Sequence, residues 1–210
     1  MDLEVIPKAD LLRLRRWGVR SGRDFPWRTG TDYEVALAEI LLQKTRGEAV
    51  EPVWRTLRDR YPTPQHLKRA RVAAIRRIVA PLGLGEQRSQ RLKALADSWD
   101  TECLSSLGPY GCAVVELSRG RVHSSAPVDG NIARVIQRYA GLSWEVGEPR
   151  KKAELKNLAF TLLRGRPAIA LRTLYALVDL GALVCTPRNP KCPLCPLRGT
   201  CASATDFLRS

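Results

Sequence analysis

The chain has 210 residues and 44% hydrophobic content, enough for one domain or two small ones with a real core. Lys and Arg total 35 against 21 acidic residues, and the resulting formal charge of +14 is typical of a protein that binds nucleic acid. No apolar run is long enough to span a membrane, and the charges along the N-terminal segment exclude a secretory signal. We therefore expect a cytoplasmic protein with no membrane partner.

Helices are predicted from the N-terminus onward. Leucines at helical spacing indicate a helix over residues 8–21, and FPWR at residues 25–28 ends it, because the residue before a proline avoids the helical conformation. Thr31 and Glu34 fit a capping box, which begins a helix that is hydrophobic nearly all round. Glu39 is the one acid in the middle of that helix. Burial would raise the pKa of Glu39 and make it a candidate proton donor, the alternative being a salt-bridged structural carboxylate.

The segments that follow look architectural. Helical patterns cover residues 48–60 and 72–80, and Thr63-Pro64 begins a short helix between them, since proline suits the first helical position. GLGEQR at residues 83–88 comes next, and it resembles the GLGYYxRA loop of the MutY adenine glycosylases.

The functional prediction depends mainly on the stretch from Leu104 to Tyr139. It reads as a short helix, a tight turn at Gly108, a second helix, a loop, and a third helix opened by VDGN at residues 128–131. Gly108 permits backbone conformations that other residues resist, and the helix start after it would present N–H groups to a phosphate. Asp129 falls where an N-cap belongs. On residue types alone, Asp129 could be only a cap and Gly108 only a turn.

The C-terminal part combines helices with a cysteine cluster. Two helical patterns cover residues 154–184, nothing in the chain reads as a convincing strand, and the predicted fold is all-α. Four cysteines with the spacing C-x6-C-x2-C-x5-C follow, namely Cys185, Cys192, Cys195 and Cys201. Because disulfides are rare in cytosolic proteins, these thiolates indicate a metal centre, either a tetrahedral zinc ion or a [4Fe–4S] cluster. We expect the other two cysteines, Cys103 and Cys112, to be buried.

Several of these segments resemble the helix-hairpin-helix DNA glycosylases, the superfamily of endonuclease III and MutY. GPYGCAV at residues 108–114 and VDGNIARVIQRY at residues 128–139 are similar to the hairpin and catalytic-aspartate motif of that superfamily. FPWR, AEILLQKT and ALVDLGA resemble segments of the MutY adenine glycosylases or of the Mig-type thymine mismatch glycosylases. The cysteine spacing resembles the one that holds a [4Fe–4S] cluster in endonuclease III and MutY. The resemblance covers residues 24–201.

The resemblance implies an all-α, two-lobed fold. A helical barrel lobe of residues 29–127 would contain the hairpin at residues 102–118, while residues 1–28 and 128–210 would form a lobe of terminal helices with the [4Fe–4S] loop. The active site would lie in the cleft between the lobes. The implied partner is double-stranded DNA containing a mismatched or damaged base, bound by a monomer that associates with the nucleoid.

The resemblance also implies roles for individual residues. Asp129 would be the catalytic carboxylate, and Glu39 would donate a proton or read the edge of the flipped base. Tyr110 stands where bifunctional members carry the lysine that forms a Schiff base and cuts the strand. DNA contacts would come from Gln43, Lys44, Gly108, Gly111, Arg88 and Asn131, and the metal ligands would be Cys185, Cys192, Cys195 and Cys201.

The predicted function is therefore that of a monofunctional DNA glycosylase of base excision repair, without lyase activity. Thymine or uracil opposite guanine is the favoured target, because Glu86 and Gln87 replace a tyrosine pair of the MutY loop, and because the chain ends nine residues after Cys201 without the C-terminal domain of MutY. Adenine opposite 8-oxoguanine or guanine is the alternative, supported by VDGN and LVDLGA. A non-catalytic DNA-binding module is the second alternative, and retention of both Asp129 and Glu39 argues against it.

Two further positions depart from the resemblance. Lys44 stands where MutY has a glutamine, in the segment expected to fill the hole left by the extruded base. Ser106 replaces the first glycine of the hairpin, which is expected to alter the turn that grips phosphate.

Overall fold

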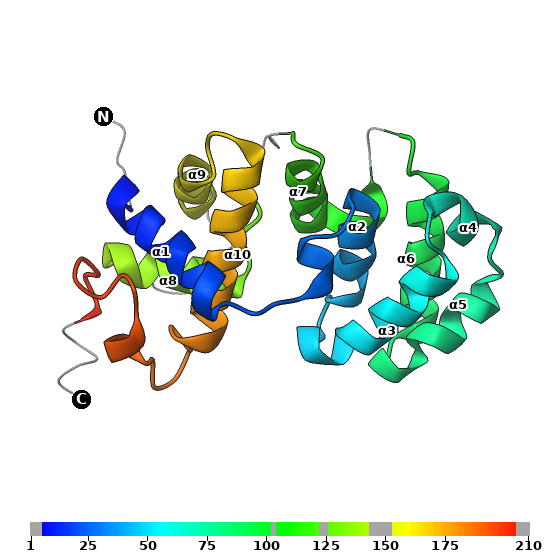
Figure 1. Cartoon of the computed structure of the whole chain (residues 1–210), viewed down its shortest axis with the longest axis horizontal. Coiled ribbons are helices and arrows are strands. Elements are labelled where there is room, and N and C mark those ends of the chain that lie inside the picture. Colours follow the sequence, from blue (N-terminus) through cyan, green and yellow to red (C-terminus); the bar gives the residue numbers. More distant parts are fainter. Residues whose placement is uncertain (1–5, 102–103, 122–125, 143–152, 205–210) are drawn as a thin grey trace. The chain divides into compact units, whose positions relative to one another are not determined.

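The computed structural model describes residues 6–101, 104–121, 126–142 and 153–204. Regular structure in these ranges is entirely helical, which confirms the predicted all-α fold (Figure 1). The α-helices are α1 (Lys8–Ser21), α2 (Asp32–Leu41), α3 (Gly47–Arg60), α4 (Pro64–Arg69), α5 (Val72–Val79), α6 (Gly85–Asp97), α7 (Gly108–Ser118), α8 (Gly130–Ala140), α9 (Ala153–Leu162) and α10 (Pro167–Leu183). Short 3-10 turns are η1 (Pro26–Arg28), η2 (Ala80–Leu82), η3 (Ser105–Leu107) and η5 (Cys192–Leu194). Within the described ranges, no helix combines the length and the apolar content needed to cross a membrane.

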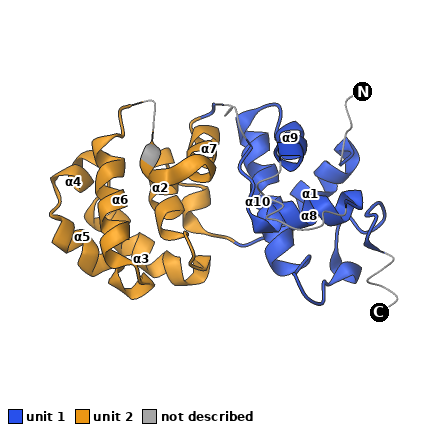
Figure 2. Ribbon diagram, turned by 180° about the vertical axis from the view of Figure 1, so that it is seen from behind, with its two compact units in different colours: residues 1–23, 120–210 blue, residues 24–119 orange. Residues whose placement is uncertain are grey.

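The chain divides into two compact units (Figure 2). Unit 1 consists of residues 1–23 and 120–210, and unit 2 of residues 24–119. The sequence-based boundaries, residues 28/29 and 127/128, differ from these by five and eight residues. Asp129 and the cysteine loop therefore belong to unit 1, whereas Glu39 and Tyr110 belong to unit 2.

Helix α2 lies at the centre of unit 2, where it packs against α3, α6 and α7. It begins with the predicted capping box: Glu34 N donates to Thr31 Oγ1 at 3.3 Å, and Thr31 N donates to Glu34 Oε2 at 2.7 Å. The helix is buried on nearly every side because its apolar residues do not keep to one stripe. Its buried residues are Tyr33, Val35, Ala36, Leu37, Ala38, Ile40 and Leu41.

Two predicted boundaries in unit 2 are wrong. The short helix expected before Gly108 is only the 3-10 turn η3, and residues 102–103, where the hairpin was predicted to begin, lie outside the described residues together with Cys103. The loop expected over residues 83–88 ends earlier, because α6 begins at Gly85 and places Glu86 and Gln87 in its first turn. Leu84, just before the helix, has a left-handed backbone with φ +51°.

In unit 1, helix α10 packs against both α1 and α8. Buried polar groups reinforce this packing. Asp179 of α10 accepts hydrogen bonds from Arg23 Nε at 2.8 Å and Arg23 N at 2.9 Å. Asp10 of α1 accepts from Tyr139 of α8 and from Thr200, next to Cys201. The start of the chain, α8 and the cysteine loop are thus joined by one buried carboxylate.

Candidate functional site

Asp129 is the N-cap of helix α8, as predicted. Its backbone is extended, with φ −99° and ψ −178°, and its Oδ1 accepts a hydrogen bond from Ile132 N at 2.8 Å. Helix α8 is strongly amphipathic, and Ile132, Val135 and Ile136 are buried against the rest of unit 1. Because this apolar face fixes the helix, the carboxylate at its start has a defined position while remaining partly exposed.

A hydrogen-bonded chain runs from Asp129 to the backbone of the cysteine loop. Asn131 Nδ2 donates to Asp129 Oδ2 at 2.9 Å, and Arg134 Nη2 donates to Asn131 Oδ1 at 2.8 Å. The same guanidinium donates to the carbonyl oxygens of Gly181 at 2.7 Å and Cys185 at 2.6 Å. Burial lowers the pKa of Arg134, although the arginine remains the donor in each of these contacts. The backbone of a cluster cysteine and the orientation of Asp129 are therefore linked through two side chains.

Asn131 was predicted to contact DNA, and the structure gives it another role. Both ends of its amide are engaged inside unit 1, one by Asp129 and the other by Arg134. Its backbone also lies against α10 at Gly181, where an added Cβ would be 2.6 Å from Asn131 Cβ and 2.9 Å from Asn131 Cα. Any side chain at residue 181 would displace Asn131, so the glycine of ALVDLGA is required by this close approach.

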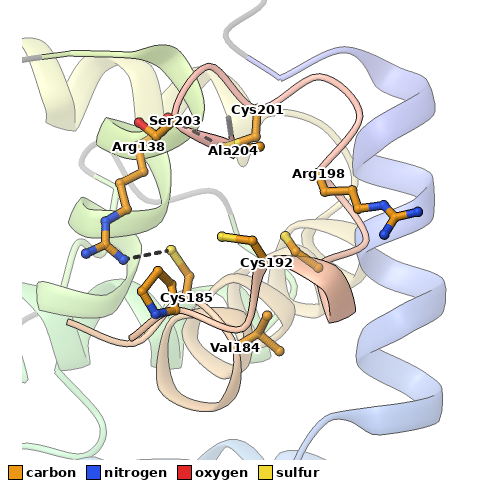
Figure 3. A pocket seen from close by; sticks show the side chains of 10 residues that line it. Arg138, Val184, Cys185, Cys192, Arg198, Cys201, Ser203 and Ala204 are labelled. Atoms are coloured by element: carbon orange, nitrogen blue, oxygen red, sulfur yellow. Dashed lines mark hydrogen bonds between the residues drawn. The ribbon is translucent and has the colours of Figure 1, made fainter. Parts of the chain in front are cut away.

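The four cysteines of the predicted metal centre line one pocket in unit 1. Figure 3 shows the side chains of Cys185, Cys192 and Cys201 around the same space, and Cys195 also lines it. Apart from Ser203, the rest of the lining is apolar or basic, and includes Val184, Ala204 and the arginines Arg138 and Arg198. Apolar and cationic surroundings suit a centre whose thiolate ligands carry negative charge.

The cysteine geometry supports the predicted metal centre. The four thiols surround a shared space, and no disulfide joins the described cysteines. Four thiolates around one space suit a metal centre of either predicted kind, a tetrahedral zinc ion or a [4Fe–4S] cluster.

Burial raises the pKa values of three of these thiols. Desolvation raises the pKa of Cys195 to about 11 and also raises the pKa values of Cys192 and Cys201. Metal binding therefore has to supply the stabilisation of the thiolates. Arg138 adds a further contact, since its Nη1 donates to Cys185 Sγ at 3.5 Å (Figure 3). The same atom donates to Thr186 O at 2.8 Å.

In unit 2, Glu39 lies in α2 beside the start of α7. It is partly buried, and an added Cβ at Gly111 would lie 3.5 Å from Glu39 Cβ. This is an ordinary van der Waals separation, and the closer neighbour of that Cβ would be Leu107 Cβ at 3.1 Å. The contact of Gly111 with DNA stays a prediction. Tyr110 precedes Gly111 and is also partly buried. Helices α2 and α7, which carry Glu39 and Tyr110, pack against each other.

Gly108 begins α7 with φ +71°, and an added Cβ there would meet no atom within 4 Å. The backbone at this position, rather than a lack of space, requires glycine. The N-terminus of α7 leaves N–H groups without helical acceptors, as the predicted phosphate contact needs. Ser106, in the preceding turn, has a buried hydroxyl with no hydrogen-bond partner in the described part of the chain.

Gln43 and Lys44 lie in the turn after α2. Lys44 is exposed and has a left-handed backbone with φ +58°, which is uncommon for a residue other than glycine. Arg91 of α6 donates a hydrogen bond from Nη1 to Gln43 Oε1. In this turn, the Gln43 side chain is held by Arg91 and the Lys44 side chain is exposed to solvent.

The prediction that Arg88 contacts DNA is wrong for this structure. The residue is only 3% exposed, and its guanidinium donates to the backbone carbonyls of Leu82, Gly83 and Gln43. A side chain buried in this way cannot reach a phosphate. Sequence reasoning missed the burial because arginine is rarely buried without a carboxylate partner.

Sequence reasoning also missed Arg134 and Arg138 and misjudged Cys112. The two arginines lie four residues apart on α8, a spacing that places them on one helix face, but their partners are about 50 residues away in sequence. Cys112 is only partly buried, and its Sγ lies 3.1 Å from Leu104 O. The expected full burial of Cys112 is therefore wrong.

Comparison with known proteins agrees with these features. Residues 37–160 match the family model described as HhH-GPD superfamily base excision DNA repair protein, and residues 185–201 match that of the iron-sulfur binding domain of endonuclease III. The cysteine loop is accordingly the site of a [4Fe–4S] cluster.

Individual relatives cover most of the chain. It is 34% identical to the thymine/uracil-DNA glycosylase of Pyrobaculum aerophilum, over 94% of this chain and 94% of that protein. It is 31% identical to the adenine DNA glycosylase of Mycobacterium tuberculosis, over 88% of this chain and 64% of that protein. The solved structure of a thermostable thymine-DNA glycosylase superposes with a TM-score of 0.77 at 28% identity, covering 95% of this chain and 96% of that one. These matches agree with the N-cap aspartate of α8 and with the four-cysteine pocket. They show that the chain belongs to the HhH-GPD superfamily of base excision DNA repair proteins.

Proposed function

We propose that this protein is a monofunctional DNA glycosylase that removes thymine or uracil mispaired with guanine and leaves an abasic site. The observation that carries the proposal is the 34% identity to a thymine/uracil-DNA glycosylase over 94% of both chains. The likeness to the thymine-DNA glycosylase structure, over 95% of this chain, supports the same substrate class. Asp129, with its position fixed by Ile132 N and Asn131, supplies the carboxylate that the reaction needs.

The chemistry begins with extrusion of the mispaired base, because the glycosidic bond is not accessible inside a duplex, and a mismatched base unstacks at lower cost. The bond between C1′ and the base nitrogen breaks, its electron pair leaves with the base, and positive charge develops on the sugar. The Asp129 carboxylate stabilises that charge. The departing base gains a proton, for which Glu39 is the proposed donor. A water molecule adds to C1′ and passes its proton to the Glu39 carboxylate, which restores the acid.

Strand cleavage is not part of the proposed reaction. A lyase step requires an amine that forms a Schiff base with C1′ of the sugar. Tyr110 offers a phenol at the position where bifunctional relatives are expected to carry that amine, and a phenol cannot form an imine. The product is therefore an intact strand with an abasic site.

The bound [4Fe–4S] cluster would be held by Cys185, Cys192, Cys195 and Cys201. When bound, it supplies a rigid cross-link within residues 185–201. Arg134 and Arg138 connect this loop to α8 through hydrogen bonds to the carbonyl oxygens of Cys185 and Thr186. The cluster thus supports the position of Asp129 through the protein's own side chains.

Adenine removal is the second candidate. It is supported by the 31% identity to an adenine DNA glycosylase over 88% of this chain and by the ALVDLGA segment of α10. Glu86 and Gln87, in the first turn of α6, replace the tyrosines expected of that subfamily and argue against it.

The monofunctional assignment is tested by splitting each glycosylase reaction on an end-labelled G·T duplex into samples with and without hot alkali. We expect strand cleavage only in the alkali-treated sample and no covalent enzyme–DNA product after borohydride reduction. Tyr110→Phe keeps the ring and is the matched control for Tyr110→Lys, which should gain borohydride trapping if residue 110 faces the sugar. Cleavage by the wild-type protein without alkali would contradict the proposal.

A further inference from the structure

We infer that Arg88 is a positioning residue that joins the two strained loops of unit 2 and holds the Gln43–Lys44 turn ready for base extrusion. The inference rests on the proposed function, because it concerns the step in which the base leaves the duplex. It also replaces the direct DNA contact that the sequence predicted for Arg88.

Two unfavourable backbone conformations define the loops. Lys44 has φ +58° in the turn after α2, and Leu84 has φ +51° just before α6. Both side chains are exposed, Leu84 by 53%. Residues other than glycine rarely hold such conformations unless the surrounding structure enforces them, and they concentrate at sites that meet a ligand.

The Arg88 guanidinium supplies that enforcement. Its Nη1 donates to the carbonyl oxygens of Leu82 and Gly83, next to Leu84. Its Nη2 donates to the carbonyl oxygen of Gln43 at 2.8 Å and to Thr45 Oγ1. These acceptors flank Lys44 on both sides, so one planar group fixes the backbone of both loops.

The setting of Arg88 is more specific than core packing requires. The residue is 3% exposed, no carboxylate in the described part of the chain forms an ion pair with it, and its Nε has no hydrogen-bond partner there. Burying a cation among neutral acceptors is costly, whereas an apolar side chain of similar length would fill the space without that cost. The benefit of arginine at this position is its fork of donors, which can hold several carbonyl groups in fixed relative positions.

Arg91 extends the same arrangement to a side chain. It lies one helical turn after Arg88 on α6, and its Nη1 donates to Gln43 Oε1. Arg88 thus holds the backbone of Gln43 while Arg91 holds its amide. Because the turn is already ordered before DNA binds, binding carries no entropic cost for ordering it. Loss of the hydrogen bonds from Arg88 should therefore slow base extrusion.

The test compares Arg88→Met with two other variants. Arg88→Met removes every hydrogen bond from the guanidinium. Thr45→Val removes one acceptor of Arg88, together with the weak donation from Thr45 Oγ1 to Gln43 O at 3.4 Å, and keeps the buried charge. It therefore remains informative if Arg88→Met does not fold. Ile75→Val, on α5, is the matched control for a general loss of stability, since Ile75 is 0% exposed and its side chain has no group that can form a hydrogen bond with either loop.

Two readouts separate positioning from folding. The first is the fluorescence of 2-aminopurine placed beside the target thymine, which rises when the base leaves the stack. The second is the single-turnover rate of base release from a G·T duplex and from a duplex with thymine opposite an abasic site, where extrusion is already cheap. We expect Arg88→Met to lose most of the fluorescence rise and to release thymine from G·T roughly 10- to 100-fold more slowly, a loss of preorganisation equal to about 1.4–2.7 kcal/mol. The abasic-site substrate should restore its rate to within roughly threefold of wild type.

Thr45→Val should show the same pattern with a smaller change, and Ile75→Val should show neither change. Equal fluorescence in wild type and Arg88→Met would overturn the inference, and so would an equal rate loss on both duplexes. If wild-type protein releases no thymine from any duplex, the proposed function fails, and the fluorescence comparison still decides the role of Arg88.

Discussion

Replacing Asp129 with asparagine separates its structural role as the N-cap of α8 from its proposed role as the carboxylate that stabilises positive charge on the sugar. As N-cap, its Oδ1 accepts from Ile132 N at 2.8 Å, and its Oδ2 accepts from Asn131 Nδ2 at 2.9 Å. Asparagine is as good an N-cap as aspartate, so its carbonyl oxygen can keep the bond to Ile132 N. The new amide nitrogen would face the amide of Asn131, and that lost hydrogen bond costs about 1 kcal/mol, or roughly 2–4 °C in melting temperature.

The loss of charge has a much larger consequence for the reaction. A carboxylate on the order of 4 Å from the developing positive charge contributes roughly 4 kcal/mol at an effective dielectric constant of about 20, which suits a partly exposed group. This energy corresponds to roughly a 1,000-fold slower release of the base. The assay is the single-turnover rate on a G·U duplex, with the melting temperature and the DNA dissociation constant measured in parallel.

A folded Asp129→Asn protein that binds DNA normally and keeps more than about a tenth of the wild-type rate would refute the role assigned to Asp129. A non-catalytic DNA-binding module would give no base release from either protein.

Three further perturbations follow from the structure. Arg134→Lys should lower the melting temperature by roughly 4–8 °C and slow base release. The reason is that one ammonium group cannot span Asn131 and the carbonyl groups of Gly181 and Cys185. A normal rate of base release in a destabilised protein would contradict the link to Asp129. Burial acts to raise the pKa of Asp10, but hydrogen bonds and Arg13 outweigh it and hold that pKa below 3.8. The stability advantage of wild type over Asp10→Asn should therefore be complete well above pH 4 and diminish as the pH falls through the lowered pKa. Chemical unfolding of both proteins at several pH values measures this difference. Oxidative removal of the cluster should abolish the broad absorbance near roughly 400 nm and lower the melting temperature. It should also make residues 185–201 accessible to proteases. Unchanged proteolysis would contradict the cross-linking role of the cluster.

Local sequence patterns predicted the parts of the site that depend on neighbouring residues. Thr31 and Glu34 form the expected capping box, and Asp129 caps α8, because both features depend on residues within one helical turn. The cysteine pocket was also predictable, since its ligands lie within residues 185–201 and their spacing is restrictive. The all-α class followed from periodicity over the whole chain.

The missed features depend on contacts between distant segments. Arg88 was expected at the DNA surface because the family resemblance implied a DNA contact there, and only the fold places the carbonyl groups of two loops around it. Asn131 has a suitable residue type for a DNA contact, but Arg134 and Gly181 enclose it. The end of the predicted loop at residue 88 was wrong because helix α6 begins directly after the left-handed Leu84, which no propensity rule anticipates.

The most direct test of the central claim is to identify the base that the purified protein releases. Duplexes carrying G·T, G·U, A·8-oxoguanine and A·G would be incubated with excess protein, and the free bases would be separated by liquid chromatography and identified by mass spectrometry. We expect free thymine and uracil from the first two duplexes, no adenine from the other two, and roughly 1,000-fold slower release by Asp129→Asn. Free adenine without thymine or uracil would contradict this expectation and place the protein with the adenine glycosylases.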